Sequence, residues 1–357
     1  MRPGGAELDR IREQVDRALR LFLAGQRPVL ADAGDDLLAG LDAVAGLLAD
    51  GKRLRPAFCY WGWRGAGGQE CPEILAAAAA LELLHAGALV HDDVIDASNT
   101  RRGRPSLHKQ FEARHQAHGW RGSAAWFGMG AALLLGDLLM CWTDDLFHAS
   151  GLPADVLARG RPVLGLMRTE VCAGQYLDLA GQASGAGTVA SALRAVELKT
   201  AKYTVERPLH LGAALAGHPA GQPVAAAYSA YGLPLGIAFQ LRDDLLGVFG
   251  DPARTGKPAG DDLREGKQTV LLALACERAS TAGATVLDRQ VGNPCLDEAG
   301  LAAVRAVIQD SGAVQECERL ITARVDEALK ALTEAPITEQ AKNALAELAV
   351  AVTVRDD

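Results

Sequence analysis

Aromatic residues make up only 5% of this 357-residue chain, and strand-like alternation of polar and apolar residues never lasts beyond a few positions. Low aromatic and β-branched content argues against a sheet protein. Alanine is abundant instead, in runs such as Ala76–Ala80, and it has the highest helix propensity of all residues. Because hydrophobic residues account for 49% of the chain, it can bury a large core, and we expect an all-α fold.

Excess positive charge is also missing. The net charge is −8 and the isoelectric point about 5.6, whereas a nucleic-acid-binding protein normally presents a basic face. A few local cations or bound metals can still hold a phosphate group. The composition therefore argues against nucleic acid as a partner but leaves a phosphorylated ligand open.

The spacing of the cysteines and the charge of the first twenty residues both bear on where the protein is expected to work. Its seven cysteines include no C-x-x-C pair, which indicates free thiols in a reducing cytosol rather than a disulfide frame or a zinc site. Residues 1–20 are charged, and the longest apolar run, Ile74–Val90, is interrupted by Glu82 and His85. We therefore expect a cytoplasmic protein without stable membrane insertion.

Helical periodicity runs along most of the chain. A first stripe at helical spacing is made of Ile11, Val15, Leu19 and Phe22. Gly25 and Pro28 are expected to end this helix. Further helices are expected at about 31–48, 56–65, 73–97, 122–149, 153–180, 190–216, 223–249, 268–281, 298–312, 314–333 and 338–352. The breaks between them, such as Ala282–Pro294, are short and rich in Gly and Pro, which is typical of a helical bundle.

An acidic cluster interrupts an apolar helix near position 92. Asp92 and Asp96 are four residues apart and share one helix face, with His85 two turns earlier. Two carboxylates at this spacing repel each other, and their place near a helix C-terminus is unfavourable. Mg²⁺, which prefers carboxylate, water and phosphate oxygens, would relieve both problems. The alternative is a solvated acidic turn near a helix end.

Two basic turns accompany this cluster. One spans 51–56 and reads GKRLRP, and the other contains Arg101, Arg102 and Arg104. Arginine binds phosphate oxygens through two parallel hydrogen bonds, and lysine acts as a point charge. Taken alone, such a turn is usually just solvated. Beside a metal-binding cluster it indicates a diphosphate held by metal on one side and guanidinium groups on the other.

A second acidic cluster, Asp243 and Asp244, again ends an apolar helix. A glycine-rich loop with Lys257 and Lys267 follows, and such a loop could close over a polyphosphate. Two other segments, 174–178 and 199–203, place polar groups on apolar helices. For these two segments a binding role and a core or solvent-facing role are equally open.

Taken in order, these motifs resemble those of the trans-isoprenyl diphosphate synthases, or polyprenyl synthetases. The matching segments are GKRLRP at 51–56, LVHDDVID at 89–96, RRG at 101–103, KT at 199–200, FQLRDD at 239–244 and GDDLREGK at 260–267. They keep the family's order and spacing over about 45–275. The segments LGD at 135–137 and DDLLG at 243–247 look most like actinobacterial geranylgeranyl diphosphate synthases.

The resemblance implies a fold and an assembly. It implies a single all-α domain over 1–357, with helices around a deep central cavity, and a homodimer. Because motifs between 52 and 267 would converge on one cavity, the length of the chain does not indicate two domains. The helices at about 298–352 carry no recognisable motif and are expected to serve packing or the dimer surface.

The resemblance also implies roles for individual residues. Two Mg²⁺ ions would be held by Asp92 and Asp96, and a third by Asp243, helped by Asp244. The allylic diphosphate would be contacted by Arg101, Lys199, Lys257 and Lys267. Isopentenyl diphosphate would be bound by Lys52, Arg55, His85 and Arg102. The developing carbocation would be bordered by Thr200 and Gln240.

In the implied reaction the allylic C–O bond ionises and the isopentenyl double bond attacks the carbocation. Metals and cations stabilise the departing diphosphate, which itself takes the proton. An apolar cavity keeps water away from the cation. One departure weakens the surroundings of the third metal: the second motif usually ends in Asp, and this chain has Gly247.

Product length is expected to depend on side chains just before the first motif. In the family, Phe or Tyr four or five positions before the first Asp stops growth early, whereas this chain has Ala88 and Gly87. This disfavours a fifteen-carbon product, and Leu84 and Leu81, one and two turns deeper, could form the floor. We expect geranylgeranyl diphosphate, with longer-chain and farnesyl products as alternatives. In another interpretation, Gly87 and Ala88 only permit close helix packing.

Three other functions fit the sequence less well. A class I terpene cyclase would carry Asn, Ser and Glu in the second motif and would not need Lys52 and Arg55. A head-to-head synthase also lacks that anchor. A non-catalytic partner subunit of a heteromeric synthase would typically lose the first acidic motif, and only Gly247 favours it.

Overall fold

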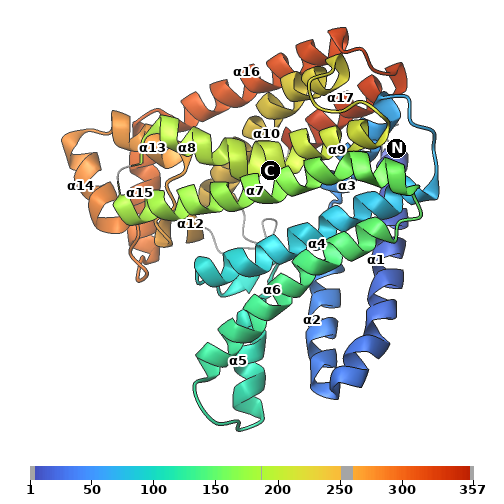
Figure 1. Ribbon diagram of the computed structural model, residues 1–357. Helices are drawn as coiled ribbons and strands as arrows, with labels where there is room; N and C mark the ends of the chain where they lie inside the picture. The colour runs from blue at the N-terminus through green and yellow to red at the C-terminus, as the bar shows by residue number, and fades with distance from the viewer. Residues whose placement is uncertain (1–4, 186, 251–259, 354–357) are drawn as a thin grey trace. The chain divides into compact units, whose positions relative to one another are not determined.

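The computed structural model describes residues 5–185, 187–250 and 260–353, which are almost entirely helical (Figure 1). The helices are α1 (Gly5–Ala33), η1 (Asp35–Leu37), α2 (Leu38–Leu48), α3 (Leu54–Gly65), α4 (Pro72–Ile95), α5 (Leu107–Ala117), α6 (Ala124–His148), α7 (Ala154–Ser184), α8 (Val189–Val196), η2 (Glu197–Glu206), α9 (Arg207–Leu215), α10 (Pro223–Phe249), α12 (Asp261–Arg264), α13 (Val270–Arg278), α14 (Thr281–Gln290), α15 (Glu298–Asp310), α16 (Ala313–Glu334) and α17 (Glu339–Thr353). One short antiparallel pair, β1 (Thr100–Arg101) and β2 (Arg104–Pro105), is the only sheet in the described residues. The expected all-α fold is confirmed.

The chain forms two compact units. The first unit consists of Met1–Arg161 and Leu211–Pro219, and the second unit of Pro162–His210 and Ala220–Asp357. Two of the boundaries fall within α7 and α9, so each of these two helices contributes residues to both units. The expectation of a single domain, with all motifs around one cavity, stays a prediction.

In the first unit α4 is the central helix and packs against α1, α3 and α6. Its alanine run, Ala77–Ala80, is completely buried, and such small side chains let neighbouring helices approach closely. α6 lies alongside α4, and α5 packs on α6 (Figure 1). α1 contributes the predicted apolar stripe, in which Ile11 and Val15 are fully buried. This packing fixes the end of α4 that carries the first acidic cluster.

In the second unit α10 packs against α16 and against η2, which is a π-helix. Glycine permits this close approach, since a Cβ at Gly236 would lie 2.3 Å from the Cα of Ala201. A Cβ at Gly174 of α7 would lie 2.7 Å from the backbone nitrogen of Lys199. π-helical segments are rare and often occur at functional sites. Here the π-helix interrupts the single helix expected at 190–216.

One expected helix end is wrong, and two helices were not expected. α1 continues through Gly25 and Pro28, because Pro28 is exposed and water can bond the carbonyl group that the proline leaves without a donor. α5 was not expected, because Gly103 and Pro105 indicated a break in the helices. They belong to the short β1–β2 hairpin, and α5 begins two residues after it. α14 occupies most of the predicted break Ala282–Pro294, with its first turn capped by the Ser280 hydroxyl.

Three helices are long and apolar enough to cross a membrane by length and composition alone: α4, α6 and α10. α4 and α10 bury 72% and 56% of their most apolar windows inside the structure, but α6 buries only 22%. The large exposed apolar side chains of α6 are Trp126, Phe127, Leu133 and Leu134. The absence of stable membrane insertion stays a prediction.

The glycine contact between α10 and the π-helix gives a first prediction. We expect Gly236→Ala to lower the free energy of unfolding by about 1–3 kcal/mol, because the added methyl group would overlap Ala201. Gly165→Ala, in α7, is the matched control: nothing lies within 4 Å of the added Cβ, so higher helix propensity should raise stability by about 0.5–1 kcal/mol. Urea denaturation measures both, and equal effects would contradict the packing role of Gly236.

Candidate active site

The first acidic cluster lies at the C-terminal end of α4, where the sequence predicts it. Asp92 is in the last turn, and Asp96 caps the helix, with its backbone N–H donating to the carbonyl oxygen of Asp92 at 2.8 Å. Carboxylates are unfavourable there, because the helix dipole places partial negative charge at this end. The cluster therefore depends on cations from other segments.

Arg101 of β1 is one such cation. Its Nε donates to Oδ1 of Asp93 at 2.9 Å, and its Nη2 donates to the same oxygen. That Nη2 atom also lies 3.5 Å from Oδ2 of Asp92. Because Asp93 is buried, this ion pair is shielded from water and strengthened. Asp93 thus holds Arg101 where its guanidinium group reaches the acidic cluster.

A cluster of cations surrounds His85, two turns before Asp92 on α4. Burial lowers the pKa of the His85 imidazole well below its ordinary value. The further causes of this lowered pKa are the guanidinium groups of Arg55, Arg102, Arg101 and Arg53. These guanidinium groups make the surroundings of His85 positive, although Arg53 is paired with Asp16 and Glu82, and Arg101 with Asp93. Such a region attracts a multiply charged anion.

The first basic turn joins α2 to α3 and supplies part of this cationic cluster. Arg55 lies partly buried in the first turn of α3, whereas Lys52 is exposed. Arg53, between them, is buried. Arg55 lies close enough to His85 to lower the pKa of its imidazole, and Lys52 is accessible from solvent.

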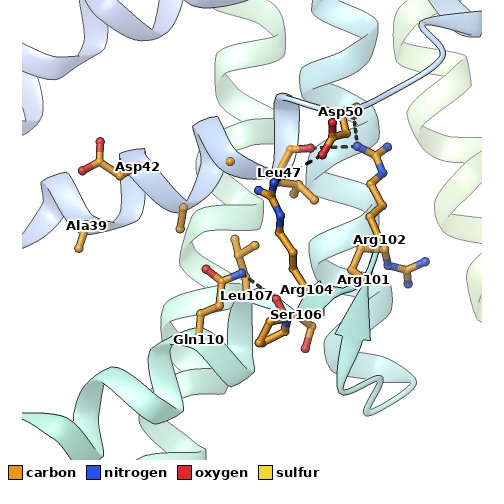
Figure 2. A pocket seen from close by; sticks show the side chains of 13 residues that line it. Ala39, Asp42, Leu47, Asp50, Arg101, Arg102, Arg104, Ser106, Leu107 and Gln110 are labelled. Carbon is orange, nitrogen blue, oxygen red and sulfur yellow. Dashed lines mark hydrogen bonds and ion pairs between the residues drawn. The ribbon is translucent and has the colours of Figure 1, made fainter. Parts of the chain in front are cut away.

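A pocket of about 530 Å³ lies beside the second basic turn, between α2, the β1–β2 hairpin and α5 (Figure 2). Arg102 points to the end of α2, where its Nη1 donates to the carbonyl of Leu47 at 3.0 Å and to that of Asp50. Arg104 also extends toward this end, with Nη2 3.9 Å from the Asp50 carboxylate. The last carbonyl groups of α2 therefore orient Arg102.

The residues predicted to set product length lie on different faces of α4. Leu81 and Leu84 are completely buried, and Ala88 is partly buried. A Cβ at Gly87 would lie 3.1 Å from the carbonyl oxygen of Gly136 on α6. Gly87 therefore permits close helix packing, which was the alternative interpretation. Ala88 and Leu84 remain on the face that leads to the first acidic cluster.

In the second unit a chain of hydrogen bonds joins three predicted residues. The Thr200 hydroxyl donates to Oε1 of Gln240 at 2.7 Å, and Nε2 of Gln240 donates to Oδ1 of Asp244 at 2.8 Å. Lys199, next to Thr200 on the π-helix, forms a 2.7 Å ion pair with Asp178 of α7. Three segments far apart in the sequence thus meet around the second acidic cluster.

Asp244 lies in surroundings that disfavour its negative charge. Its pKa is raised to about 8, first by burial and further by the carboxylates of Asp262, Asp243 and Asp178, against the lowering effect of the Gln240 hydrogen bond. Its Oδ2 is buried and has no hydrogen-bond partner. A buried carboxylate oxygen without a donor, among other carboxylates, fits a hard divalent cation.

The carboxylates do not form a complete metal cage. Among the residues that the structure describes, no three His, Cys, Asp or Glu side chains are placed as a ready-made metal site. Mg²⁺ usually takes only one or two carboxylates and completes its shell with water and substrate phosphates. The donor set therefore fits Mg²⁺ bound together with a diphosphate better than Mg²⁺ bound alone.

Gly247, where the family's second motif usually has Asp, faces another carboxylate. A Cβ at this position would lie 2.7 Å from Oδ2 of Asp262. Asp262 also lies 3.6 Å from Nζ of Lys267, which pairs with Glu265 at 3.0 Å. Asp262 therefore occupies the place of the side chain that Gly247 lacks. Lys257, predicted to contact the allylic diphosphate, lies outside the described residues.

Sequence reasoning missed four carboxylates that pair with the predicted cations: Asp93, Asp178, Asp262 and Glu265. All four lie in segments that the sequence analysis had already selected as motifs or polar segments, and this was the signal that could have found them. The Asp178–Lys199 pair depends on contact between two separate helices, which spacing along the chain does not reveal.

Comparison with known proteins identifies the family. The profile of the polyprenyl synthetase family matches residues 41–308, a stretch that contains every motif from 51–56 to 260–267. The chain belongs to this family. The expected enzyme class is thereby confirmed: this polyprenyl synthetase is a trans-prenyltransferase that elongates prenyl chains.

Individual relatives resemble this polyprenyl synthetase over nearly their whole length. A geranylgeranyl pyrophosphate synthase from Corynebacterium glutamicum, solved with isoprenyl diphosphate and magnesium, is 41% identical with a TM-score of 0.94, covering 98% of this chain and 99% of that one. A geranylgeranyl diphosphate synthase of Mycobacterium tuberculosis is 31% identical, covering 93% of this chain and 89% of its own. Component 2 of a heptaprenyl diphosphate synthase from Geobacillus stearothermophilus is 33% identical, covering 87% and 88%. The likeness to actinobacterial members is confirmed.

The lowered pKa of His85 predicts a pH dependence of stability. As the pH falls below about 6.5, the unfolded chain protonates His85 while the folded protein resists protonation, so acid favours unfolding. We expect the free energy of unfolding to fall by up to about 1.4 kcal/mol per pH unit more steeply in the wild type than in His85→Gln. Urea denaturation between about pH 7 and pH 5 measures this difference.

The comparison of these two proteins isolates His85. His108 and His210, whose pKa values burial also lowers, are present in both. Parallel stability curves for the two proteins would contradict the positive potential inferred around His85.

Proposed function

We propose that this polyprenyl synthetase joins isopentenyl diphosphate to an allylic diphosphate in a Mg²⁺-dependent reaction that yields geranylgeranyl diphosphate. The observation that carries the proposal is the cationic cluster around His85, two helical turns from Asp92 on the same helix. A diphosphate needs both kinds of group, because guanidinium groups bind its oxygens and a metal ion bridges it to carboxylates.

Isopentenyl diphosphate is proposed to bind the cationic cluster of the first unit, through Lys52, Arg55, His85 and Arg102. Arg102 is already oriented by the carbonyls of Leu47 and Asp50. The His85 imidazole is neutral near pH 7, because its pKa is low, so it serves as a hydrogen-bonding group rather than as a charge. The positive charge that draws the diphosphate therefore comes from arginine and lysine.

The allylic diphosphate is proposed to contact Arg101, Lys199, Lys257 and Lys267. In the described part of this set, each cation is paired with a carboxylate: Arg101 with Asp93, Lys199 with Asp178 and Lys267 with Glu265. A cation held by a carboxylate keeps a defined orientation, and a diphosphate of higher charge can compete for it. The ion pairs thus preorganise the cations before the substrate binds.

Mg²⁺ ions, three in number, are proposed to be held by Asp92 and Asp96 in the first unit and by Asp243 with Asp244 in the second. When bound, they would neutralise the charge that builds on the departing diphosphate. The raised pKa of Asp244 supports this role, since a divalent cation nearby would offset the repulsion from Asp262 and Asp178.

The remaining residues protect and guide the carbocation. Thr200 and Gln240 are proposed to border it, because their hydrogen-bonded oxygens carry partial negative charge in fixed positions. Leu81 and Leu84, which are completely buried, are proposed to form the apolar floor that the prenyl tail would reach. The isopentenyl double bond attacks the cationic carbon. The released diphosphate takes the proton that the isopentenyl unit loses, so no protein side chain has to act as the base.

A second candidate function is that of a partner subunit in a heteromeric synthase. Gly247 and the similarity to a component of a heptaprenyl diphosphate synthase favour it. Asp262 weighs against it, because its carboxylate fills the place that a side chain at position 247 would take. The first acidic cluster is also retained. We therefore favour a chain that is active without a different partner.

A twenty-carbon product is favoured by the side chains on α4. Ala88 leaves room next to the first acidic cluster, and the buried Leu84 and Leu81 follow on the same side of the helix. Relatives from Corynebacterium glutamicum and Mycobacterium tuberculosis are both named as geranylgeranyl synthases. Farnesyl and longer products remain the alternatives that a product assay separates.

The protein is further proposed to act as a homodimer in the cytoplasm. α6 exposes Trp126 by 69% and Leu134 by 71%, and Leu133 and Phe127 stand beside them in the sequence. Exposed apolar residues gathered on one helix mark an interaction surface. A second copy of the chain, which presents the same apolar helix, would cover it.

A product assay tests the catalytic proposal. We incubate the purified chain with isopentenyl diphosphate, Mg²⁺ and each allylic starter and expect a dominant twenty-carbon diphosphate by mass spectrometry. Asp92→Ala should lower kcat by about 10²–10³-fold, because it removes a metal ligand. Asp155→Ala, which removes an exposed carboxylate from α7, is the control and should change kcat less than about twofold.

Each outcome of this assay separates the alternatives. A series of longer products would support the proposed condensation reaction but would exclude Leu84 and Leu81 as the residues that limit chain length. A folded chain that condenses no starter would overturn the catalytic proposal and favour the partner-subunit function.

Light scattering after size exclusion tests the homodimer. We expect a dimeric wild type and a shift to monomer in Leu134→Glu, because the new charge would be buried against the second copy. Val350→Glu, which charges an exposed apolar residue of α17, should stay dimeric. A monomeric wild type, or equal behaviour of the two variants, would contradict the role of α6.

A further inference from the structure

Arg53 stands between two residues proposed to bind isopentenyl diphosphate, yet its own side chain is turned inward. Only 2% of that side chain is exposed. Its Nε donates to Oδ1 of Asp16 on α1 at 2.7 Å, and its Nη1 donates to Oε2 of Glu82 on α4 at 2.8 Å. Its Nη2 donates to the carbonyl of Leu48 at the end of α2. One guanidinium group thus ties three helices together.

The backbone at Arg53 needs this support. Arg53 has φ 53°, in the left-handed region, where side chains other than glycine are strained. It is also the residue just before α3, so its backbone sets the direction in which that helix leaves the turn. Strain of this kind persists only where surrounding contacts fix the conformation. The three hydrogen bonds of the guanidinium group provide those contacts.

Gly51 is explained by the same guanidinium group. A Cβ at Gly51 would lie 2.6 Å from Nη1 of Arg53 and 3.6 Å from Oε2 of Glu82. Gly51 does not have a positive φ, so its conformation does not require glycine. The glycine of the GKRLRP motif therefore makes room for the Arg53 side chain as it folds back toward Glu82.

We propose that Arg53 is a positioning residue for isopentenyl diphosphate and that Gly51 provides the space in which it works. Arg53 does not touch the substrate. It fixes the turn so that Lys52 and Arg55, on either side of it, present their charges to the same diphosphate. This inference rests on the proposed function of that site.

The position of Arg102 depends on the same part of the chain as that of Arg53. Both guanidinium groups donate to carbonyl groups at or just after the end of α2: Arg53 to Leu48, and Arg102 to Leu47 and Asp50. The two guanidinium-bearing residues also line one small cavity together with Glu82 and His85. A shift of the α2 end would therefore move Arg102 as well as Lys52 and Arg55. Loss of Arg53 should weaken the whole anchor without removing any of its charges.

The test must separate positioning from folding. Arg53→Met alone would leave Glu82 as an unpaired buried charge and could simply unfold the protein. The double variant Arg53→Met with Glu82→Leu removes both charges, and replacing a buried ion pair by apolar groups is often neutral for stability. Gly51→Ala is a second, independent variant, because it retains every charge and displaces only the guanidinium group. Arg27→Met with Asp42→Leu, an exposed ion pair between α1 and α2, is the matched control.

Two readouts are measured for each variant. Calorimetry gives the Kd of isopentenyl diphosphate, which needs no turnover, and steady-state kinetics gives separate KM values for the two substrates. We expect Kd and KM for isopentenyl diphosphate to rise about tenfold or more in Gly51→Ala and in the double variant. The KM for the allylic substrate and kcat should change by less than about threefold, and the control should match the wild type.

The inference is overturned if isopentenyl diphosphate binds both folded variants as tightly as the wild type. It is also overturned if kcat, the kcat/KM values of both substrates and the denaturation midpoint all fall together, because that result marks a purely structural residue. A wild type that binds isopentenyl diphosphate but condenses nothing would contradict the proposed function, while the calorimetric comparison would still decide the role of Arg53.

Discussion

Groups of like charge lie close together in partly or fully buried places in each unit, and holding them there is the constraint on which the rest of the structure depends. In the first unit, four guanidinium groups depress the pKa of His85. In the second unit, three carboxylates raise the pKa of Asp244, which burial has already raised. Charges of one sign repel and desolvation adds to the cost. In the first unit carboxylates offset part of this cost, because Arg53 pairs with Asp16 and Glu82, and Arg101 pairs with Asp93. Rigid packing around them is therefore required.

That rigidity comes from small residues at the points of closest approach. The buried alanines of α4 and the contact of Gly87 with Gly136 bring α4 and α6 together. Gly236 and Gly174 do the same for the π-helix that carries Lys199 and Thr200. Ion pairs then fix individual cations, as Asp93 does for Arg101. Packing and pairing together hold the charged groups in defined places before any ligand arrives.

The sequence predicted the fold class, most helices and the place of the acidic clusters, because these depend on local patterns. The helical period marks the stripe with Ile11 and Val15, and carboxylates in an apolar background mark Asp92 and Asp243. Local patterns failed where solvent or a contact with another helix determines the structure. Because Pro28 is exposed to water, α1 continues past it. A π-helix that packs against α10 interrupts the single α-helix expected at 190–216.

The pairing of charges was the least predictable feature. Asp178 and Lys199 are far apart in the sequence but form an ion pair, and the proximity of Asp262 to Gly247 follows only from the fold. The sequence suggested that Gly247 leaves the second motif one carboxylate short. The structure places the carboxylate of Asp262 in that position instead. A sequence motif records the order of residues along the chain, so it does not show that the side chain of one residue fills the place left by another.

The most direct test of this account is the thermal stability of the purified chain with Mg²⁺ alone, with inorganic diphosphate alone, and with both. The carboxylates bind the metal, the cations bind the diphosphate, and each ligand helps the other to bind. We therefore expect the rise in Tm with the mixture to exceed the sum of the two separate rises. Binding at a concentration about 100 times Kd would add about 2.7 kcal/mol of stability. No rise with the mixture, or an equal rise with either component alone, would contradict the claim that these charged groups form a site for a metal-bound diphosphate.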